Sequence, residues 1–185
     1  EIQEYEIPWS IEYSVTLYRL EYHTTDTWNG MTIASGVLAI PSGLNQNYPM
    51  ISFQHGTVLK RSSVASENGF DLISMWLGGR GNLTLIPDFL GLGVSQILHP
   101  YMISRPSATT VVDMIRASKY LCDSLNVGYT DELYLAGYSE GGYVTMAAHK
   151  YIEEELSSEL TVTASAPCAG PYDLSSVIPI DFNNS

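Results

Sequence analysis

The sequence predicts an α/β protein in which a mostly parallel sheet lies between two layers of helices, a three-layer α/β/α sandwich. From residue 49 onward, short apolar runs typical of strands alternate with segments of helical periodicity. Such alternation is typical of right-handed crossovers, which leave the strands parallel and place helices on both faces. Before residue 41, polar and apolar residues alternate on either side of a turn signal, as they do in an antiparallel hairpin.

We expect one domain over residues 1–185, because a chain of this length can bury one sizeable core. Its expected parts are an opening hairpin over residues 11–40, a parallel core over residues 49–166, and a last segment, residues 167–185. This last segment would follow the sixth strand or begin a lid. No repeat, low-complexity tract or linker precedes Pro167.

The opening hairpin is indicated by strict alternation in its first strand. Residues 11–17 carry four apolar side chains on one face, namely Ile11, Tyr13, Val15 and Leu17. A polar turn is expected to follow and to end at Asn29–Gly30, a pair that favours tight hairpin turns. The second strand should then run from Met31 to Ile40 and end at the Pro41-Ser42-Gly43 segment.

The core is expected to alternate strands with helices. The strands are predicted at residues 50–53, 83–86, 133–136 and 160–166, and the helices around residues 72–77, 110–125 and 144–152. Thr110 and Asp113 have the spacing of a capping box, so the longest helix should begin near them, and Gly128 should end it.

The composition excludes several classes of partner. The net charge is −12 and only eight residues are Lys or Arg, so nucleic acid and anionic membrane surfaces are poor partners. No apolar run reaches the length of a membrane span. The acidic balance, with few lysines and many tyrosines, indicates a secreted or periplasmic protein. Cys122 and Cys168 could form one disulfide or remain buried thiols, and neither has the spacing of a metal ligand.

The strongest local motif is Gly137-Tyr138-Ser139-Glu140-Gly141, which joins an apolar strand to a segment of helical periodicity. This is the G-x-S-x-G nucleophile elbow, a turn too tight for side chains at the glycine positions. It holds the serine hydroxyl clear of the backbone at the positive end of the following helix. A chance match to so short a pattern is the alternative, but the strand before it and the helix after it favour a nucleophilic Ser139.

Three motifs, each after a predicted strand, together resemble the α/β-hydrolase fold, and most of all its secreted bacterial serine lipases and esterases. They are residues 54–57 (Gln-His-Gly-Thr), residues 87–93 (Pro-Asp-Phe-Leu-Gly-Leu-Gly) and residues 137–142 around Ser139, with residues 164–167 and 170–174 in further agreement. The resemblance implies that the backbone N–H groups of Thr57 and Glu140 form an oxyanion hole beside the Ser139 hydroxyl.

The resemblance also implies supporting roles. Gly56 would let its loop approach the substrate. His55 is interpreted as a histidine that hydrogen-bonds this loop, rather than as a catalytic group. Asp88 should anchor the glycine-rich loop in which it lies rather than serve as the triad acid. The Glu140 side chain is expected to face solvent or to pair with a loop, because the useful atom of this residue is its backbone nitrogen.

No histidine in the chain is an obvious general base for Ser139. His149 follows by ten residues on the same predicted helix, which separates the two by about 15 Å along the axis. A general base must come within about 3 Å of the hydroxyl. His23 and His99 are interpreted as ordinary loop histidines. Asp173 is a possible acid, although an Asp that forms a turn is the alternative.

The resemblance implies further strands and a histidine-bearing loop beyond this sequence. We therefore interpret the chain as the N-terminal part of the fold, whose partner is the remaining C-terminal part, supplied in the same or a separate chain. The expected function is a serine carboxylic-ester hydrolase that acts on a small-molecule ester or lipid without metal or cofactor. The alternatives are a serine peptidase of the same superfamily and an inactive half-domain that binds a ligand. The Ser at position 139 argues against an Asp-nucleophile dehalogenase.

Overall fold

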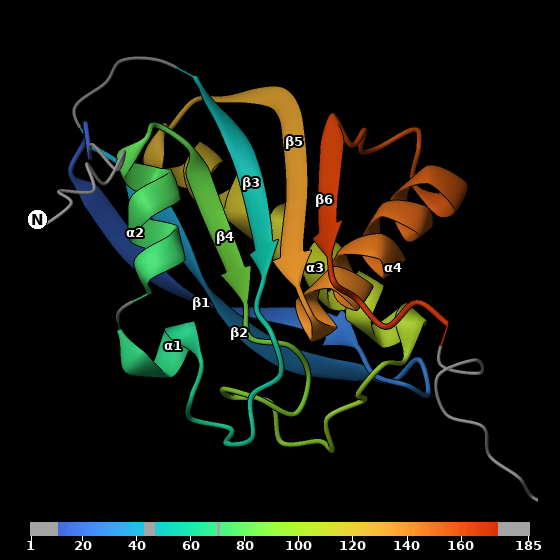
Figure 1. Cartoon of the computed structure of the whole chain (residues 1–185). Helices are drawn as coiled ribbons and strands as arrows, with labels where there is room; N and C mark the ends of the chain where they lie inside the picture. The colour runs from blue at the N-terminus through green and yellow to red at the C-terminus, as the bar shows by residue number, and fades with distance from the viewer. Residues whose placement is uncertain (1–10, 43–46, 70, 174–185) are drawn as a thin grey trace, which may run out of the picture.

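The computed structural model describes residues 11–42, 47–69 and 71–173. They form a six-stranded sheet with the strand order β1-β2-β4-β3-β5-β6 (Figure 1). The strands are β1 (Val15–Thr25), β2 (Met31–Pro41), β3 (Tyr48–Gln54), β4 (Leu83–Pro87), β5 (Tyr129–Tyr138) and β6 (Ala164–Cys168). The first three strands of this order pair antiparallel, and the pairs β4–β3, β3–β5 and β5–β6 are parallel.

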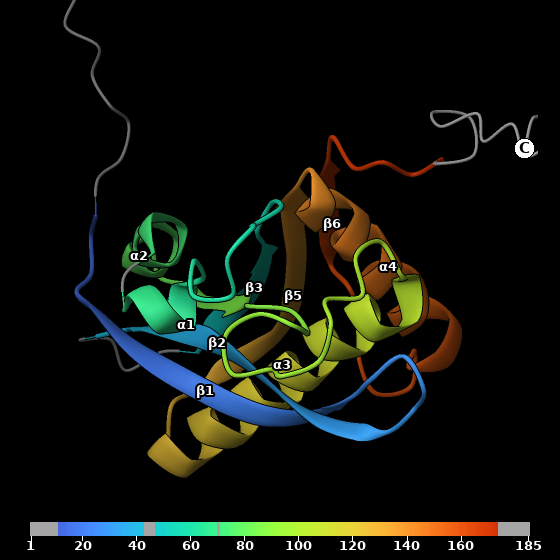
Figure 2. The same cartoon turned by 90° about the horizontal axis from the view of Figure 1, so that it is seen from below.

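Helices cover both faces of the sheet. They are α1 (Ala65–Asn68), α2 (Leu72–Gly79), α3 (Ser104–Leu125) and α4 (Glu140–Glu155). The view from below shows α1 and α2 on one face and α3 and α4 on the other (Figure 2). The main core lies between the sheet and the second pair, where Leu38, Leu85, Met114 and Ile152 are fully buried. The predicted α/β/α layering and mostly parallel sheet are confirmed. Among the described helices, none combines the length and apolarity that a bilayer span requires.

The hairpin is confirmed, but its first strand was placed too early. β1 extends from Val15 to Thr25, so the residues expected to form a polar turn continue the strand. The reason is that β1 buries different faces along its length. Leu17 packs beside Val37 on the α2 side, whereas Leu20 and Tyr22 belong to the main core on the α3 side. The alternation therefore changes phase near residue 18, which looks like a strand end in the sequence.

The predicted start and end of the longest helix were both wrong. α3 begins at Ser104 and carries Pro106 in its first turn, where the missing proline N–H breaks no helical hydrogen bond. Thr110 lies inside the helix, and its hydroxyl donates to the carbonyl oxygen of Pro106 at 2.7 Å instead of capping. Asn126, in the left-handed conformation with φ of 55°, ends the helix two residues before Gly128. The short helix α1 was not expected.

The last strand and the cysteines also differ from expectation. β6 is limited to Ala164–Cys168, and the side chains of Ala164 and Ala166 are exposed in the described chain. Cys122 and Cys168 are both free thiols, so the possible disulfide is wrong. Cys122 is buried as expected, but Cys168 is exposed because it ends the edge strand β6.

Candidate active site

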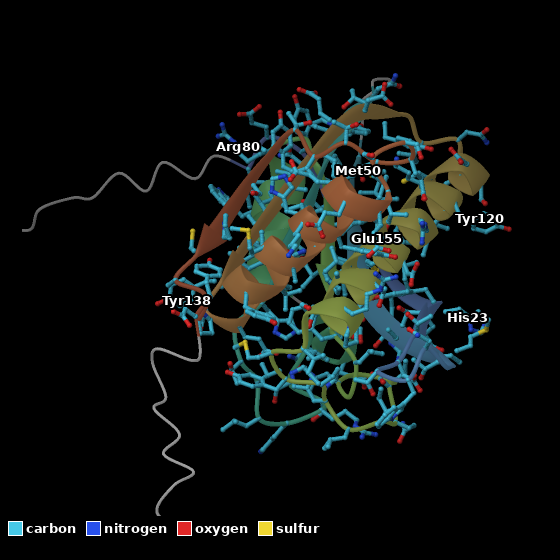
Figure 3. The ribbon with its side chains drawn as sticks, turned by 90° about the vertical axis from the view of Figure 1, so that its right-hand side faces the viewer. His23, Met50, Arg80, Tyr120, Tyr138 and Glu155 are labelled. Atoms are coloured by element: carbon cyan, nitrogen blue, oxygen red, sulfur yellow. The ribbon has the colours of Figure 1, made fainter. Side chains whose placement is uncertain are left out.

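The carboxyl ends of the parallel strands meet at one edge of the sheet, where ligands of open α/β sheets bind. In Figure 1 this is the lower edge, toward which the arrowheads of β3, β4 and β5 point. Figure 3 shows Tyr138, the last residue of β5, at this end of the molecule and Arg80 at the opposite end. All three sequence motifs follow these strands, so the fold brings them together.

Ser139 occupies the turn between β5 and α4 in a conformation that is rare for a residue with a side chain. Its φ is 58° and its ψ is −120°. Its N–H donates to the carbonyl oxygen of Cys168 at 3.0 Å, and its own carbonyl accepts from the Tyr143 N–H at 3.2 Å as α4 begins. Such backbone strain costs about 1–3 kcal/mol and is concentrated at functional sites. The hydroxyl is thereby presented from a sharp bend at the N-terminus of a helix.

The glycines on either side of Ser139 are required by close backbone contacts. A methyl group on Gly137 would lie 2.3 Å from the carbonyl oxygen of Gly141. One on Gly141 would lie 1.9 Å from the carbonyl oxygen of Gln54, at the end of β3. The turn therefore packs directly against the neighbouring strand, and any side chain at these positions would push the two apart.

A buried amide fixes the same junction. The Gln54 side chain is fully buried between β3 and α4. All its groups are satisfied when its nitrogen donates to the Thr145 hydroxyl at 2.7 Å and to the Ala136 carbonyl at 2.6 Å, and its oxygen accepts from the Ser52 hydroxyl at 2.7 Å. These bonds join β3, β5 and α4 directly behind the turn, so they help to hold Ser139 in place.

The loop after β3 runs beside the Ser139 side chain. A methyl group on Gly56 would lie 3.8 Å from the Ser139 Cβ, which shows how near this loop comes. The ring nitrogens of His55 contact two backbone oxygens, those of Gly56 at 2.7 Å and Asp88 at 3.1 Å. Because both oxygens can only accept, a neutral His55 ring donates to one of the two loops. Thr57 follows on the exposed side of the loop.

The carboxylate of Asp88 is buried at the start of the next loop. Its Oδ2 accepts from the Ser35 hydroxyl at 2.6 Å, and its Oδ1 accepts from the Ser66 N–H at 3.3 Å. These contacts tie the loop after β4 to β2 and α1. These contacts agree with an anchoring role for Asp88, which stays a prediction.

The Glu140 side chain is buried and pairs with a loop, which is one of the two environments expected for it, whereas the solvent-facing alternative was wrong. Its Oε1 lies 2.7 Å from the Nε2 of His99, in the loop between β4 and α3. The Nδ1 of His99 lies 2.6 Å from the carbonyl oxygen of Leu90. Burial lowers the pKa of His99, but the hydrogen bonds to Glu140 and Leu90 raise it by more, so that it lies above 6.5. Sequence reasoning missed this pair, because 41 residues separate its members.

The other histidines are placed away from the nucleophile. His149 contacts the Ser165 hydroxyl at 2.8 Å and the Glu153 carboxylate at 3.2 Å, and His23 is exposed on the far side of the molecule from Tyr138 (Figure 3). His23 therefore belongs to β1 and is not a loop residue. In the described part of the chain no histidine hydrogen-bonds the Ser139 hydroxyl, and no cluster of metal-ligating side chains occurs. Asp173 is exposed.

The arrangement of these elements was compared with that of known proteins. No family model and no curated protein matches the sequence. Among solved structures, the chain resembles a protein from Legionella pneumophila described as a hydrolase, with 35% identity over 90% of this chain and a TM-score of 0.83. It also resembles the ligand-bound rice cell wall degrading esterase LipA from Xanthomonas oryzae, with 32% identity over 91% of this chain and a TM-score of 0.85. The chain has the α/β-hydrolase fold.

This chain spans less than half of each of these two proteins. It covers 46% of the Legionella structure and 46% of the ligand-bound LipA structure. A more distant likeness, to lipase A of Candida antarctica, has 18% identity over 82% of this chain and 37% of that one, with a TM-score of 0.59. At that identity the likeness shows the fold alone.

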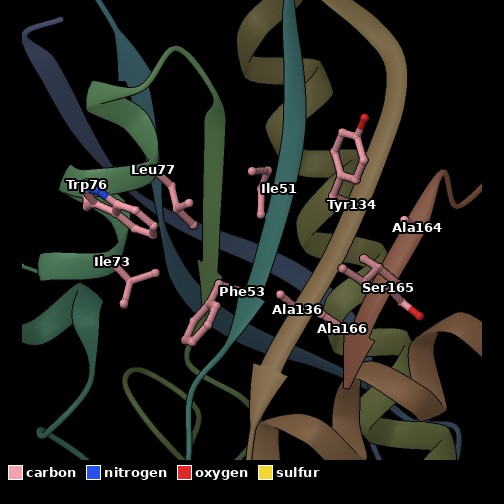
Figure 4. Close-up of a pocket in the computed structure, with 11 residues that line it drawn as sticks. Ile51, Phe53, Ile73, Trp76, Leu77, Tyr134, Ala136, Ala164, Ser165 and Ala166 are labelled. Atoms are coloured by element: carbon pink, nitrogen blue, oxygen red, sulfur yellow. The ribbon is translucent and has the colours of Figure 1, made fainter. Parts of the chain in front are cut away.

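The α/β-hydrolase sheet carries an apolar pocket of about 360 Å³ on the face that α2 covers in part (Figure 4). The pocket crosses β3, β5 and β6, and Figure 4 shows Phe53, Ala136 and Ala166 on its floor with Trp76 of α2 at its side. It lies on the sheet face, and none of the residues of the three motifs at 54–57, 87–93 and 137–142 lines it, whereas residues 164–166 do.

Proposed function

We propose that this chain contributes the nucleophile and oxyanion hole of a serine carboxylic-ester hydrolase that works through an acyl-enzyme on Ser139. The observation that carries the proposal is the backbone of Ser139, whose φ of 58° presents the hydroxyl at the edge of the sheet where the three motif loops meet. Backbone strain of this kind persists only where the surrounding structure fixes the conformation, and it is concentrated at functional sites. The glycines packed on either side supply that constraint.

In the proposed reaction the Ser139 oxygen attacks the carbonyl carbon of an ester while a general base takes the hydroxyl proton. The carbonyl electron pair moves to oxygen, and the N–H groups of Thr57 and Glu140 donate hydrogen bonds to it. The Glu140 N–H lies at the first position of α4, where unpaired amides and the helix dipole favour negative charge. Collapse then releases the alcohol and leaves an acyl ester on Ser139, which water hydrolyses. Losing one such donor typically lowers kcat by about 10²–10³.

The general base is assigned to the rest of the protein. His149 is engaged with Ser165 and Glu153, and His55 has both ring nitrogens on backbone oxygens. In α/β-hydrolases the histidine follows the nucleophile and the acid in the chain. Asp173 stays the candidate acid within this sequence, since it follows β6 on the exposed side.

We assign the apolar pocket over β3, β5 and β6 to contact with the remaining part of the fold. In the described sheet β6 is an edge strand, and an uncovered apolar face beside an open edge is an aggregation hazard. The similar structures are more than twice as long as the part that this chain matches, so they have enough further chain to cover it.

The substrate is proposed to be a small-molecule ester or a lipid. LipA of Xanthomonas oryzae is described as an esterase that degrades the rice cell wall, and the Legionella protein as a hydrolase, which supports ester hydrolysis in general. An exported location, indicated by the acidic composition, stays a prediction.

The test is covalent labelling of the full-length protein with a fluorophosphonate probe. We expect wild type to react at Ser139 and S139A not to react, while S165A, which alters a half-buried serine on the adjacent strand, reacts normally. Turnover of 4-nitrophenyl esters without turnover of peptides supports an esterase, and the reverse supports a peptidase. Failure of folded, full-length wild type to react would refute the nucleophile.

A further inference from the structure

The loop between β4 and α3 contacts both residues of the proposed oxyanion hole. The Nε2 of His99 lies 2.7 Å from the Glu140 carboxylate. The Tyr101 hydroxyl lies 2.9 Å from the Thr57 hydroxyl. Only Pro100 separates His99 from Tyr101, so one short segment contacts the start of α4 and the loop after β3 at the same time.

We propose that His99-Pro100-Tyr101 is a positioning segment, which sets the separation of the Thr57 and Glu140 amides by holding the side chains of these two residues. The inference rests on the proposed function, because only an acyl-transfer site requires those amides at a fixed spacing. His99 and Tyr101 are positioning residues that act through the oxyanion-hole residues, without contact with the substrate.

The segment is itself rigidly supported. The Nδ1 of His99 donates to the carbonyl oxygen of Leu90 at 2.6 Å and so closes the base of the loop between them. Gly91, with φ of 80°, packs against the His99 backbone so closely that a methyl group would lie 2.4 Å from the His99 nitrogen. The Phe89 ring stacks on His55 at 4.3 Å and lies parallel to the His99 ring at 6.4 Å. Such support lets the segment resist displacement of the residues it holds.

Of the two contacts that the positioning segment makes, the contact with Glu140 is the stronger. The side chain of Glu140 is 2% exposed and that of His99 is 21% exposed. The second carboxylate oxygen, Oε2, is buried and has no partner in the described chain, so His99 is the group that compensates this charge. Because the Leu90 carbonyl can only accept, Nδ1 carries a proton, and a second proton shared between Nε2 and Oε1 keeps the pair neutral overall. An uncompensated buried carboxylate would be costly.

The shared proton makes the contact between His99 and Glu140 depend on pH. Glu140 on α4 and Tyr101 on the same loop are the titratable groups that face the His99 ring, and His55 of the β3 loop lies on the other side of Phe89. The pKa of His99 is raised above 6.5, so the full contact is present below the ordinary pKa and is lost as the pH rises through the raised one. After that loss, either a nitrogen lone pair faces the carboxylate or the bond to Leu90 breaks.

The experiment compares ester hydrolysis by variants of the full-length protein from acidic to alkaline pH. We expect H99A and E140A each to lower kcat about tenfold to a hundredfold with little change in KM, because a transition-state contact is misplaced. The double variant should be no worse than either single one, since the two residues act as a unit. Y101F should have a smaller effect, because Tyr101 and Thr57 are both exposed. H149A and E153A alter another histidine–carboxylate pair on α4 and should leave kcat unchanged.

E140Q provides the decisive comparison. The glutamine NH₂ can donate to Nε2 of a neutral His99 while Nδ1 keeps its bond to Leu90, so the geometry survives without the shared proton. We expect E140Q to lower kcat less than E140A does and to lose the alkaline decline that the wild-type pair produces, whereas E140A remains impaired at every pH. A purely structural Glu140 would not move this limb, and E140Q gives the answer even where E140A fails to fold.

The inference is overturned if H99A and E140A behave like H149A and E153A, or if E140Q keeps the wild-type alkaline limb. Labelling of Ser139 by the fluorophosphonate probe in those same preparations would show that the proposed function stands while the positioning role fails. An unlabelled wild-type protein would instead refute the proposed function, and the inference with it.

Discussion

Replacement of Gly141 by alanine should displace the candidate active site as a unit. The added methyl group would lie 1.9 Å from the Gln54 carbonyl oxygen and 2.6 Å from that of His55. Ordinary contact begins at 3.4 Å, so the start of α4 must move by about 1.5 Å away from β3. Both obstacles are backbone atoms, so no change of side-chain rotamer can relieve the overlap.

The expected cost follows from this overlap. Overpacking of a close-packed interior costs about 1–3 kcal/mol, and the better helix propensity of alanine returns at most about 1 kcal/mol. We therefore expect a net destabilisation of about 2 kcal/mol, which is about 4–8 °C in Tm for a domain of this size. A misplacement of about 1 Å at reacting groups costs about 10²-fold in rate, so labelling of Ser139 should slow by at least that factor.

The assay pairs thermal unfolding with the rate of fluorophosphonate labelling, and Gly56→Ala is the matched control. Its methyl group would lie 3.5 Å from the Tyr138 carbonyl oxygen and 3.8 Å from the Ser139 Cβ, so it should leave Tm unchanged. Labelling of G56A should still slow, because the methyl group enters the space beside the nucleophile. A G141A protein with wild-type Tm and labelling rate would refute the close packing of the elbow against β3.

Three further predictions concern other parts of the chain. S139G should unfold at a higher temperature than S139A, although both lack the hydroxyl, because glycine adopts a φ of 58° without the strain of about 1–3 kcal/mol; equal melting temperatures would contradict the strained turn. The Cys122 thiol should resist Ellman's reagent in the folded protein at pH 8 and react after unfolding, since it is buried and burial, followed by Asp123, raises its pKa to about 11; rapid modification of Cys122 in the folded protein would count against its burial. In the full-length protein A166E should lower the free energy of unfolding by several kcal/mol, because the added charge would be buried where the remaining fold covers the apolar pocket. The control M31E, on a strand residue that is 79% exposed, should change it by less than about 0.5 kcal/mol. Equal effects of the two substitutions would show that nothing covers the pocket.

The elements that the sequence predicted well are those with a strong local pattern. The strands β3 and β4 are short apolar runs close to their predicted bounds, and β5 contains the predicted run at residues 133–136 although it begins at Tyr129. The errors occur where one residue pattern serves two packing partners. The first strand changes its buried face near residue 18. The start of α3 was missed because Pro106 lies in its first turn, and a proline is more typical of a loop.

In the candidate site, too, the local motifs were predicted and the long-range contacts were not. The fold brings Ser139, the Gly56 loop and the Asp88 loop to one edge, as the order of motifs implied, while the catalytic roles of these residues stay proposals. The buried environment of Glu140 could not be predicted, because an exposed carboxylate is the ordinary state of an acidic residue in the first turn of a helix. His99 offered no local signal at all.

The sequence by itself determined the turn at Ser139 and the alternation that builds a parallel sheet. Both depend on neighbours a few residues apart, where glycine, proline and apolar spacing act directly on the backbone. Only the tertiary structure decided that Glu140 pairs with His99, 41 residues away, and that Gln54 bonds Thr145, 91 residues away. A buried polar group takes whichever partner the packed elements bring within about 3 Å, and that choice is made by the arrangement of β3, β4 and α4 in space rather than by any spacing along the chain.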